Sequence, residues 1–296
     1  MYYLGDMAEF EEDKDITEIS EVFDPKSSTI VENLLRALGE DRGAAEHLCQ
    51  ILRAGDEGID YSEIFKICNL EGNNSNPFAQ NFLGMLYRLG LSVEVDNKIA
   101  FELFMKSAEE GNEFAQNNLG KMYELGLGVE VNMFEAVTWY EVSAEQGNAD
   151  AMNNLACVYH LGASGISVDN EKAFMLFKSA AEQKHVVAMN NLGNMYREGH
   201  GVRRSEAEAF RWYKLASVGG NSNAENNLGT MYSFGVHVSR NSEEALKYFR
   251  SAAKKGNELA KKNLIHQEQV EKENHRTLFS FIAAGVTFVA AGLIIL

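Results

Sequence analysis

The chain has 296 residues, of which 43 are acidic and 27 are basic, so its formal net charge at pH 7 is −16. This balance argues against a nucleic-acid-binding protein, which would need a basic stripe, and against an N-terminal half that lies on an anionic membrane. Three cysteines are too few for a disulfide framework and indicate a reducing compartment.

The first predicted segment, residues 1–27, is an acidic arm. Between Asp6 and Asp24 it contains nine acidic residues and one lysine, with apolar residues scattered among them. Such a composition resists packing, so we expect a disordered arm that adds solubility, with a specific acidic docking motif as the alternative. The arm has no basic stretch followed by an apolar one, so no secretory signal is predicted.

Residues 28–76 are predicted to form a lead-in helix and a degenerate capping repeat. The stretch STIVENLLRALG places its apolar residues on one helical face, with Ser28 or Thr29 as the N-cap. A further pattern begins at Ala44, four residues before Leu48, and YSEIFKICNLEGN then supplies a second helix with Phe65 as its large aromatic. Terminal repeats of solenoids are commonly atypical, because one face has no neighbour.

Residues 77–264 contain five copies of one pattern. A leucine recurs with steps of 36, 36, 37 and 36 residues, at Leu83, Leu119, Leu155, Leu192 and Leu228. An alanine precedes each leucine by four positions, and a second helical pattern such as EAVTWYEVSAEQGN lies between the copies. The Gly-Asn that ends most copies stops this second helix. The fixed period predicts a solenoid of helical pairs, which we call helix A and helix B.

Each helix A carries a small residue in its interior, a glycine in four copies and Ala156 in the third. A glycine there costs roughly 1 kcal/mol relative to alanine. We expect it to make room for a large aromatic of helix B, whose burial contributes about 1.5–3 kcal/mol. The structural positions predicted in this way are Gly84, Gly120, Gly193, Gly229, Tyr140 and Tyr213.

The whole motif, A-x-x-N-L-G-x-M-Y-x-x-G-x-G-V and then A-x-x-W-Y-x-x-A-A-x-x-G-N, resembles the Sel1-like repeat family, a relative of tetratricopeptide repeats. The resemblance covers about Ser75 to Asn263. It implies an all-α fold, a right-handed superhelical solenoid of helical pairs. Members of that family are mostly adaptors, among them a subunit of the ER-associated degradation ligase, chitin-synthase activators and bacterial host-interacting proteins.

The C-terminal end is predicted to be a polar juxtamembrane helix or linker (residues 265–277) and a transmembrane helix (residues 278–296). Leu278 to Leu296 is 19 residues without a charge, enough at about 1.5 Å per residue to cross a hydrocarbon core of about 30 Å. Basic residues precede it, including Lys272 and Arg276. We therefore expect a tail anchor in the ER or another organelle membrane, with the repeats in the cytosol. A buried helix and a truncated larger protein are the alternatives.

No catalytic residue, metal site or cofactor is predicted. Cys157 and His160 have C-x-x-H spacing, but a metal site needs more ligands. None of the seven histidines has the nucleophile and carboxylate that catalysis requires. A hydrolase is accordingly disfavoured.

The predicted function is that of a membrane-anchored scaffold or adaptor whose concave surface binds protein partners. The resemblance implies that helix A lines this surface, and any one of its residues has plain solvated surface as the alternative. The tentative partner-binding residues are Met85, Arg88, Lys121, Glu124, Asn194, Arg197, Thr230 and Ser233. Two other functions stay open: an adaptor in an ER-associated ubiquitin ligase complex, and a bacterial effector in a host membrane.

Overall fold

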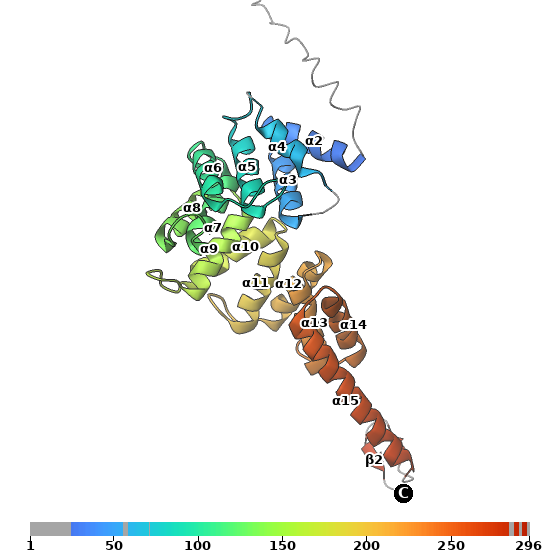
Figure 1. The fold of residues 1–296 in the computed structure, drawn as a ribbon. Helices are drawn as coiled ribbons and strands as arrows, with labels where there is room; N and C mark the ends of the chain where they lie inside the picture. Colours follow the sequence, from blue (N-terminus) through green and yellow to red (C-terminus); the bar gives the residue numbers. More distant parts are fainter. Residues whose placement is uncertain (1–24, 56–58, 71, 284–286, 290–291, 295–296) are drawn as a thin grey trace, which may run out of the picture. The chain divides into compact units, whose positions relative to one another are not determined.

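The computed structural model describes residues 25–55, 59–70, 72–283, 287–289 and 292–294, with side chains from residue 30 to residue 277. The chain folds into two units, Met1–Trp139 and Tyr140–Leu296, each with its own hydrophobic core. Apart from two short strands, the regular elements of the described residues are helices that follow one another as hairpins (Figure 1). Most of the predicted acidic arm, up to residue 24, lies outside the described residues.

Unit 1 contains the lead-in helix, the degenerate pair and the first repeats. Its helices are α2 (Pro25–Leu38), α3 (Arg42–Ala54), α4 (Tyr61–Cys68), α5 (Pro77–Leu89), α6 (Asn97–Glu109) and α7 (Glu113–Leu125). The next helix, α8 (Met133–Glu145), crosses the boundary between the two units.

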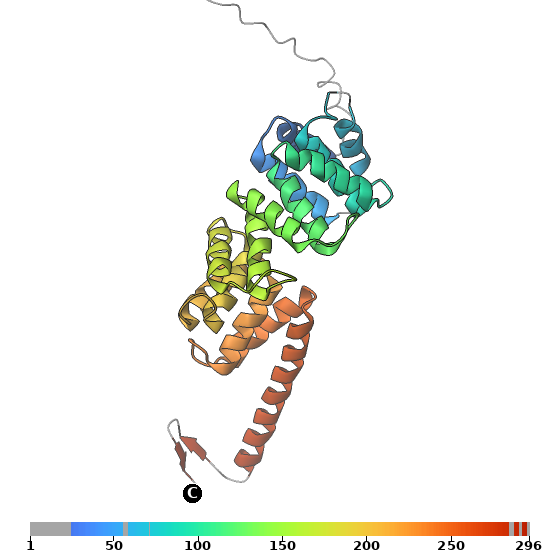
Figure 2. The same cartoon turned by 90° about the vertical axis from the view of Figure 1, so that its left-hand side faces the viewer.

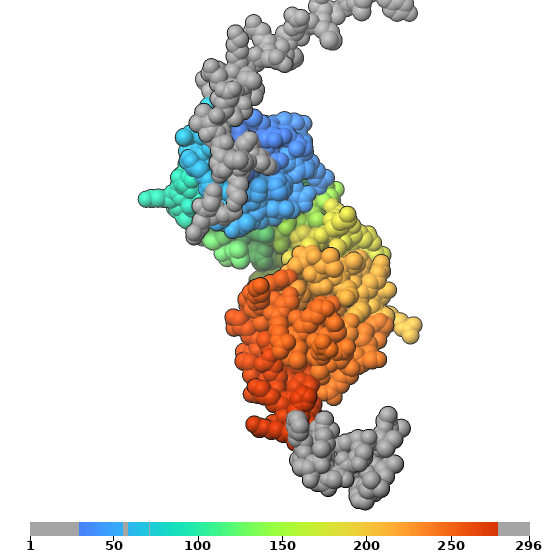
Figure 3. All heavy atoms as spheres, turned by 90° about the vertical axis from the view of Figure 1, so that its right-hand side faces the viewer, coloured from blue at the N-terminus to red at the C-terminus, as the bar shows by residue number. Residues whose placement is uncertain are grey.

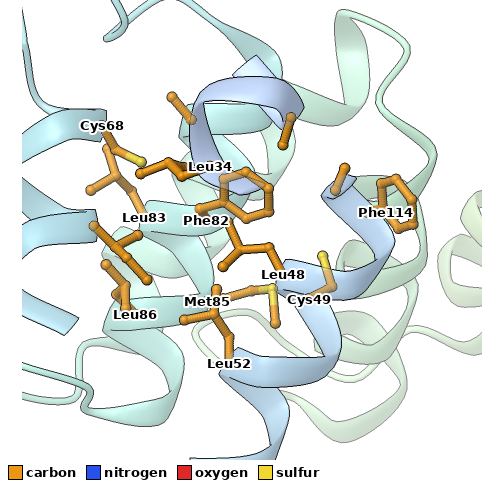
Figure 4. Packing of buried hydrophobic residues seen from close by; sticks show 14 of the residues in the cluster. Leu34, Leu48, Cys49, Leu52, Cys68, Phe82, Leu83, Met85, Leu86 and Phe114 are labelled. Carbon is orange, nitrogen blue, oxygen red and sulfur yellow. The ribbon is translucent and has the colours of Figure 1, made fainter. Parts of the chain in front are cut away.

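The core of unit 1 joins the lead-in helix and the degenerate pair to the first repeat. Leu34 of α2, Leu48 of α3 and Phe82 of α5 are fully buried and point into one cluster (Figure 4). Each such side chain contributes about 1.5–3 kcal/mol by leaving water. The end of the repeat array is thereby covered by α2, α3 and α4 rather than left open to solvent.

Unit 2 contains the remaining repeats and a long final helix. Its elements are α9 (Ala149–Leu161), α10 (Asn170–Glu182), α11 (Val186–Glu198), α12 (Glu206–Val218), α13 (Ser222–Phe234), α14 (Ser242–Lys254), α15 (Glu258–Ala283), β1 (Thr287–Val289) and β2 (Gly292–Ile294). The first turns of α15 pack on α13 and α14, and the helix then runs past them (Figure 2). In the space-filling view α13, α14 and the start of α15 form one closely packed surface (Figure 3).

The same cap chemistry sets the limits of the repeated helices. Helix A corresponds to α5, α7, α9, α11 and α13, and helix B to α6, α8, α10, α12 and α14. The Asn of each Gly-Asn pair is the N-cap of the next helix A, as where Asn112 accepts a hydrogen bond from the backbone N–H of Ala115 over 2.9 Å. Its glycine has positive φ, for example +92° at Gly111, a conformation that most residues resist.

The glycine inside helix A lies against an aromatic ring of helix B. A Cβ placed on Gly84 would be 2.7 Å from Cε1 of Phe104, and one on Gly193 would be 2.6 Å from Cε1 of Tyr213. Gly229 faces Phe249 in the same way, at 2.6 Å. A side chain at these positions would overlap the ring. Gly120 and Tyr140 are both buried, but they belong to different units, so their pairing stays a prediction.

The predicted transmembrane helix over residues 278–296 is not present. Helix α15 ends at Ala283, and Thr287–Val289 then pairs antiparallel with Gly292–Ile294, with Thr287 opposite Ile294. Branched and aromatic residues such as Thr287, Phe288 and Ile294 favour strands, so the apolar run does not continue as one helix. No helix among the described residues combines the length and the apolar character that a membrane span needs. This finding contradicts the predicted tail anchor and single-pass membrane localisation.

Candidate functional site

Two positions in every helix A change from repeat to repeat, although the residues around them recur. The first directly follows the glycine or alanine in the helix interior, and the second lies three residues later, after a recurring tyrosine. We call them the A positions. They are occupied by Met85, Lys121, Cys157, Asn194 and Thr230, and by Arg88, Glu124, His160, Arg197 and Ser233. All except Met85 are partly exposed.

In unit 1 the A positions combine charged side chains with one core residue. Met85 is fully buried in the cluster around Leu48, so the predicted exposure of its side chain is wrong. Arg88, Lys121 and Glu124 are half-buried. Burial, together with the nearby positive charge of Arg53, lowers the pKa of Arg88. The Nε of Arg88 is buried and has no hydrogen-bond partner among the described residues.

In unit 2 the A positions form part of a polar network. The hydroxyl of Tyr213 donates to Oδ1 of Asn194 over 2.7 Å, and Nη2 of Arg197 donates to Glu198 over 2.6 Å. Burial alone would lower the pKa of Arg197, but the hydrogen bond to Glu198 raises it above its ordinary value, so the guanidinium keeps its charge. Ser233 donates to Oε1 of Gln267 over 2.7 Å.

Thr230 differs from the other predicted residues, because its hydroxyl donates to the backbone oxygen of Asn226 in its own helix over 3.0 Å. Its side chain is half-buried and presents a methyl group as well as a hydroxyl. The structure therefore brings polar and charged A positions to the surface in both units.

A ladder of asparagine side chains lies beside the A positions. It joins α5 to α7 in unit 1, and it joins α9, α11, α13 and α15 in series in unit 2. In each bond the Nδ2 of one asparagine donates to the Oδ1 of an asparagine in the helix A before it, at 2.8–3.1 Å, and the last donor comes from α15. The pairs are Asn118 with Asn81, Asn191 with Asn153, Asn227 with Asn190 and Asn263 with Asn226. Buried amides that satisfy one another fix the register between helices. The ladder was not predicted, although the Asn-Asn pair that precedes the leucine in four of the five copies was its signal.

Titratable side chains do not gather into a reaction centre in the part of the chain that the structure describes. His160 lies next to His200, with ring centroids 5.2 Å apart, and its Nδ1 is 2.8 Å from Oδ1 of Asn170. His185 contacts Asp150 at 3.2 Å. Among the described residues no three histidine, cysteine or acidic side chains come together as ligands for a metal ion.

The family model of the Sel1 repeat matches five segments of the chain, residues 77–112, 114–148, 149–185, 186–221 and 222–257. The chain belongs to the Sel1 repeat family. It is similar to the crystal structure of a Sel1 repeat protein from Oxalobacter formigenes, with 33% identity over 69% of this chain and 81% of that chain, and a TM-score of 0.64.

A second solved structure, a protective antigen of uropathogenic Escherichia coli strains with an SLR fold, has 25% identity over 82% of this chain and 61% of that one, at a TM-score of 0.48. None of the curated proteins matches the chain. The predicted Sel1-type solenoid of helical pairs is thus confirmed.

Membership of the Sel1 repeat family explains which residues recur and which do not. The alanines, leucines and glycines of the motif are buried and build the solenoid. The A positions lie between these residues on the same helices, and all except Met85 are partly exposed. Folds of this family are typical of protein–protein interaction scaffolds.

Proposed function

We propose that the chain is an interaction scaffold that binds a protein partner through its A positions. The observation that carries this proposal is the contrast within each helix A. Residues that build the solenoid are repeated, whereas the partly exposed positions between them change from lysine to asparagine to threonine, and from arginine to glutamate to serine. A residue whose role is only to keep the helix soluble is usually fully exposed, whereas most A positions are half-buried beside the asparagine ladder.

The energetics of interfaces support the same surface. A few partly buried polar and aromatic anchors normally supply most of the binding free energy, and arginine is prominent among them. Arg88 and Arg197 are both half-buried, and the hydrogen bond to Glu198 keeps the guanidinium of Arg197 charged. Such groups lose little further hydration when a partner binds, so complementary acceptors on the partner stabilise the complex at low cost.

The test uses a charge exchange that preserves the net charge. The double variant Lys121→Glu/Glu124→Lys reverses two A positions on α7, three residues apart. We expect its unfolding free energy to stay within about 0.5 kcal/mol of the wild type, as for most surface changes, and its capture of partner proteins to fall. Quantitative mass spectrometry of affinity-purified complexes from the native cell measures the second effect.

The matched control is Glu244→Lys/Lys247→Glu, the same exchange at the same spacing on α14, a helix B. This variant should recover the wild-type set of proteins. A second test variant, Arg197→Glu, probes unit 2, with its folding checked by circular dichroism because Arg197 is half-buried. If both A-position variants capture the same proteins in the same amounts as the control, the A positions do not bind the partner.

A further inference from the structure

Unit 2 contains a cavity of about 510 Å³ between α8 and α10, with α9 as its floor. Its lining is largely apolar. Ala144 comes from α8, Met152 and Leu155 from α9, and Met175 and Leu176 from α10. Leu155 is only 3% exposed, whereas Met175 is 60% exposed, so the cavity extends from the buried core to the surface.

The cavity lies where α10 has smaller side chains than the two neighbouring helices B. Trp212 occupies the position of Leu176 in the following helix B, 36 residues later, and is only 9% exposed there. Trp139 occupies it in the preceding helix B. Similarly, Leu215 stands where α10 has Ser179, another residue of the cavity wall. Two replacements by smaller residues in the same helix leave apolar surface of α9 uncovered, which costs free energy unless something else covers it.

The rim of this cavity is acidic. Glu141, Glu145 and Glu171 surround the opening, and Lys172 is the basic residue of the wall. Glu141 accepts a hydrogen bond from the hydroxyl of Tyr159 over 2.8 Å, and the ammonium of Lys172 lies 4.9 Å from the centre of the Tyr159 ring. Among the described residues the carboxylates of Glu145 and Glu171 make no hydrogen bond and no ion pair.

From this arrangement we propose a second docking site: the cavity receives a leucine-, methionine- or phenylalanine-sized side chain from a basic segment of a partner protein. The apolar wall binds the anchor, and the two methionines let the wall adapt to its shape. Lysine or arginine residues next to the anchor then meet the two uncompensated carboxylates. A negative rim around an apolar pocket favours that combination over an acidic or neutral segment.

This site shares no residue with the predicted partner-binding A positions, so it stands or falls independently of the function proposed above. The probe is a fluorescein-labelled synthetic helical peptide of lysine, alanine and leucine, with the leucines on one face. We expect it to bind the wild-type chain in a fluorescence anisotropy titration. Leu176→Trp restores the side chain of the neighbouring repeats, fills the cavity and leaves the net charge unchanged, so the affinity should fall by about tenfold or more.

A second variant guards against a folding defect. Met175→Lys changes an exposed side chain and places a positive charge at the cavity, so it should fold normally and also weaken binding. The matched control is Leu103→Trp, the same substitution at the equivalent position of the first repeat, which should leave the affinity unchanged. The exchange Lys121→Glu/Glu124→Lys should likewise have no effect.

Three results would overturn the proposal. The first is wild-type affinity in the Leu176→Trp variant. The second is equal binding of a peptide in which alanine replaces every leucine, because the acidic charge alone would then hold the probe. The third is no binding of the leucine peptide to the wild-type chain. Conversely, a peptide with glutamate in place of lysine should bind weakly, in keeping with the acidic rim.

Discussion

Asn118 donates a hydrogen bond from its Nδ2 to Oδ1 of Asn81, 2.9 Å away in the preceding helix A, and both side chains are almost fully buried. Two neutral amides in the core therefore satisfy each other across a repeat junction. Because unsatisfied buried amides are costly, this pair selects one register of α7 against α5.

The first prediction concerns this pair. Asn118→Leu keeps the size of the side chain but leaves the carbonyl of Asn81 without its donor, so we expect a loss of about 1–3 kcal/mol in the free energy of unfolding. The double variant Asn81→Leu/Asn118→Leu removes both polar groups and should be less destabilised than the sum of the two single variants. Thermal and urea melts followed by circular dichroism measure the cycle. Strict additivity would show that the hydrogen bond contributes nothing.

The second prediction concerns the glycines that face aromatic rings. Gly193→Ala and Gly229→Ala both introduce a methyl group against a ring, but Tyr213 is held by its hydroxyl on Asn194, whereas Phe249 has no such tether. The ring of Tyr213 can therefore move away from the new methyl group less easily than the ring of Phe249. We expect Gly193→Ala to lower the melting temperature more than Gly229→Ala does. Leucine at either position should cost about 1–3 kcal/mol or more by overpacking. Equal melting temperatures for Gly193→Leu and the wild type would refute the packing argument.

The third prediction concerns the buried thiol of Cys68. Burial raises its pKa to about 12 from an ordinary value of 9.0. Alkylation by iodoacetamide requires the thiolate, so at pH 8 the folded chain should be modified at half-buried Cys157 well before Cys68. Peptide mass spectrometry after brief labelling distinguishes the two sites. In urea both cysteines should react alike, and equal rates in the folded chain would contradict the prediction.

The same shift has a consequence for stability at alkaline pH. Between pH 9 and about pH 12 the unfolded chain releases the Cys68 proton while the folded chain keeps it. The folded state then binds more protons than the unfolded state, so the free energy of unfolding falls as pH rises through this window. Below pH 9 the contribution is fully present. Cys68→Ala should flatten this part of the pH profile, whatever its effect on absolute stability.

Local periodicity was sufficient to predict the helices, because each repeat presents the same apolar face at the same spacing. Contacts between repeats were harder to predict. Phe65 was assigned the large aromatic position of α4, but Cys68 lies 36 residues before Phe104 and is the residue buried there. Phe65 instead meets Tyr87 of the next helix edge to face, with ring centroids 5.9 Å apart. The 36-residue spacing of the repeats, rather than the aromatic residue type, identifies the equivalent position in α4.

The candidate site was predictable only in part, because local periodicity does not report contacts between repeats. Helical spacing placed these residues on one stripe of helix A, and all of the A positions except Met85 are partly exposed. It could not show that Met85 turns into the core, because that depends on contacts with the preceding degenerate repeat. The apolar C-terminal run was misread because hydropathy counts apolar residues and ignores their strand preference. The cavity beside Leu176 reflects a difference between neighbouring repeats, so the pattern of a single repeat could not predict it.

The last prediction concerns the one repeat whose Gly-Asn pair is replaced by Lys184 and His185. Lys184 has φ of +67°, and its N–H donates to the carbonyl of Ala181 over 2.9 Å. Gly147 makes the same bond to Ala144 at 2.9 Å with φ of +88°. A residue with a side chain costs about 1–2 kcal/mol in this conformation. Replacing Lys184 by glycine removes that cost, but glycine loses more conformational freedom on folding, which offsets roughly 0.5–1 kcal/mol of the gain.

Lys184→Gly should therefore raise the melting temperature slightly, and Gly147→Lys should lower it clearly. The control is Lys178→Gly in the middle of α10, where glycine should cost about 1 kcal/mol. If Lys184→Gly and Lys178→Gly destabilise the chain equally, the left-handed conformation of Lys184 carries no strain.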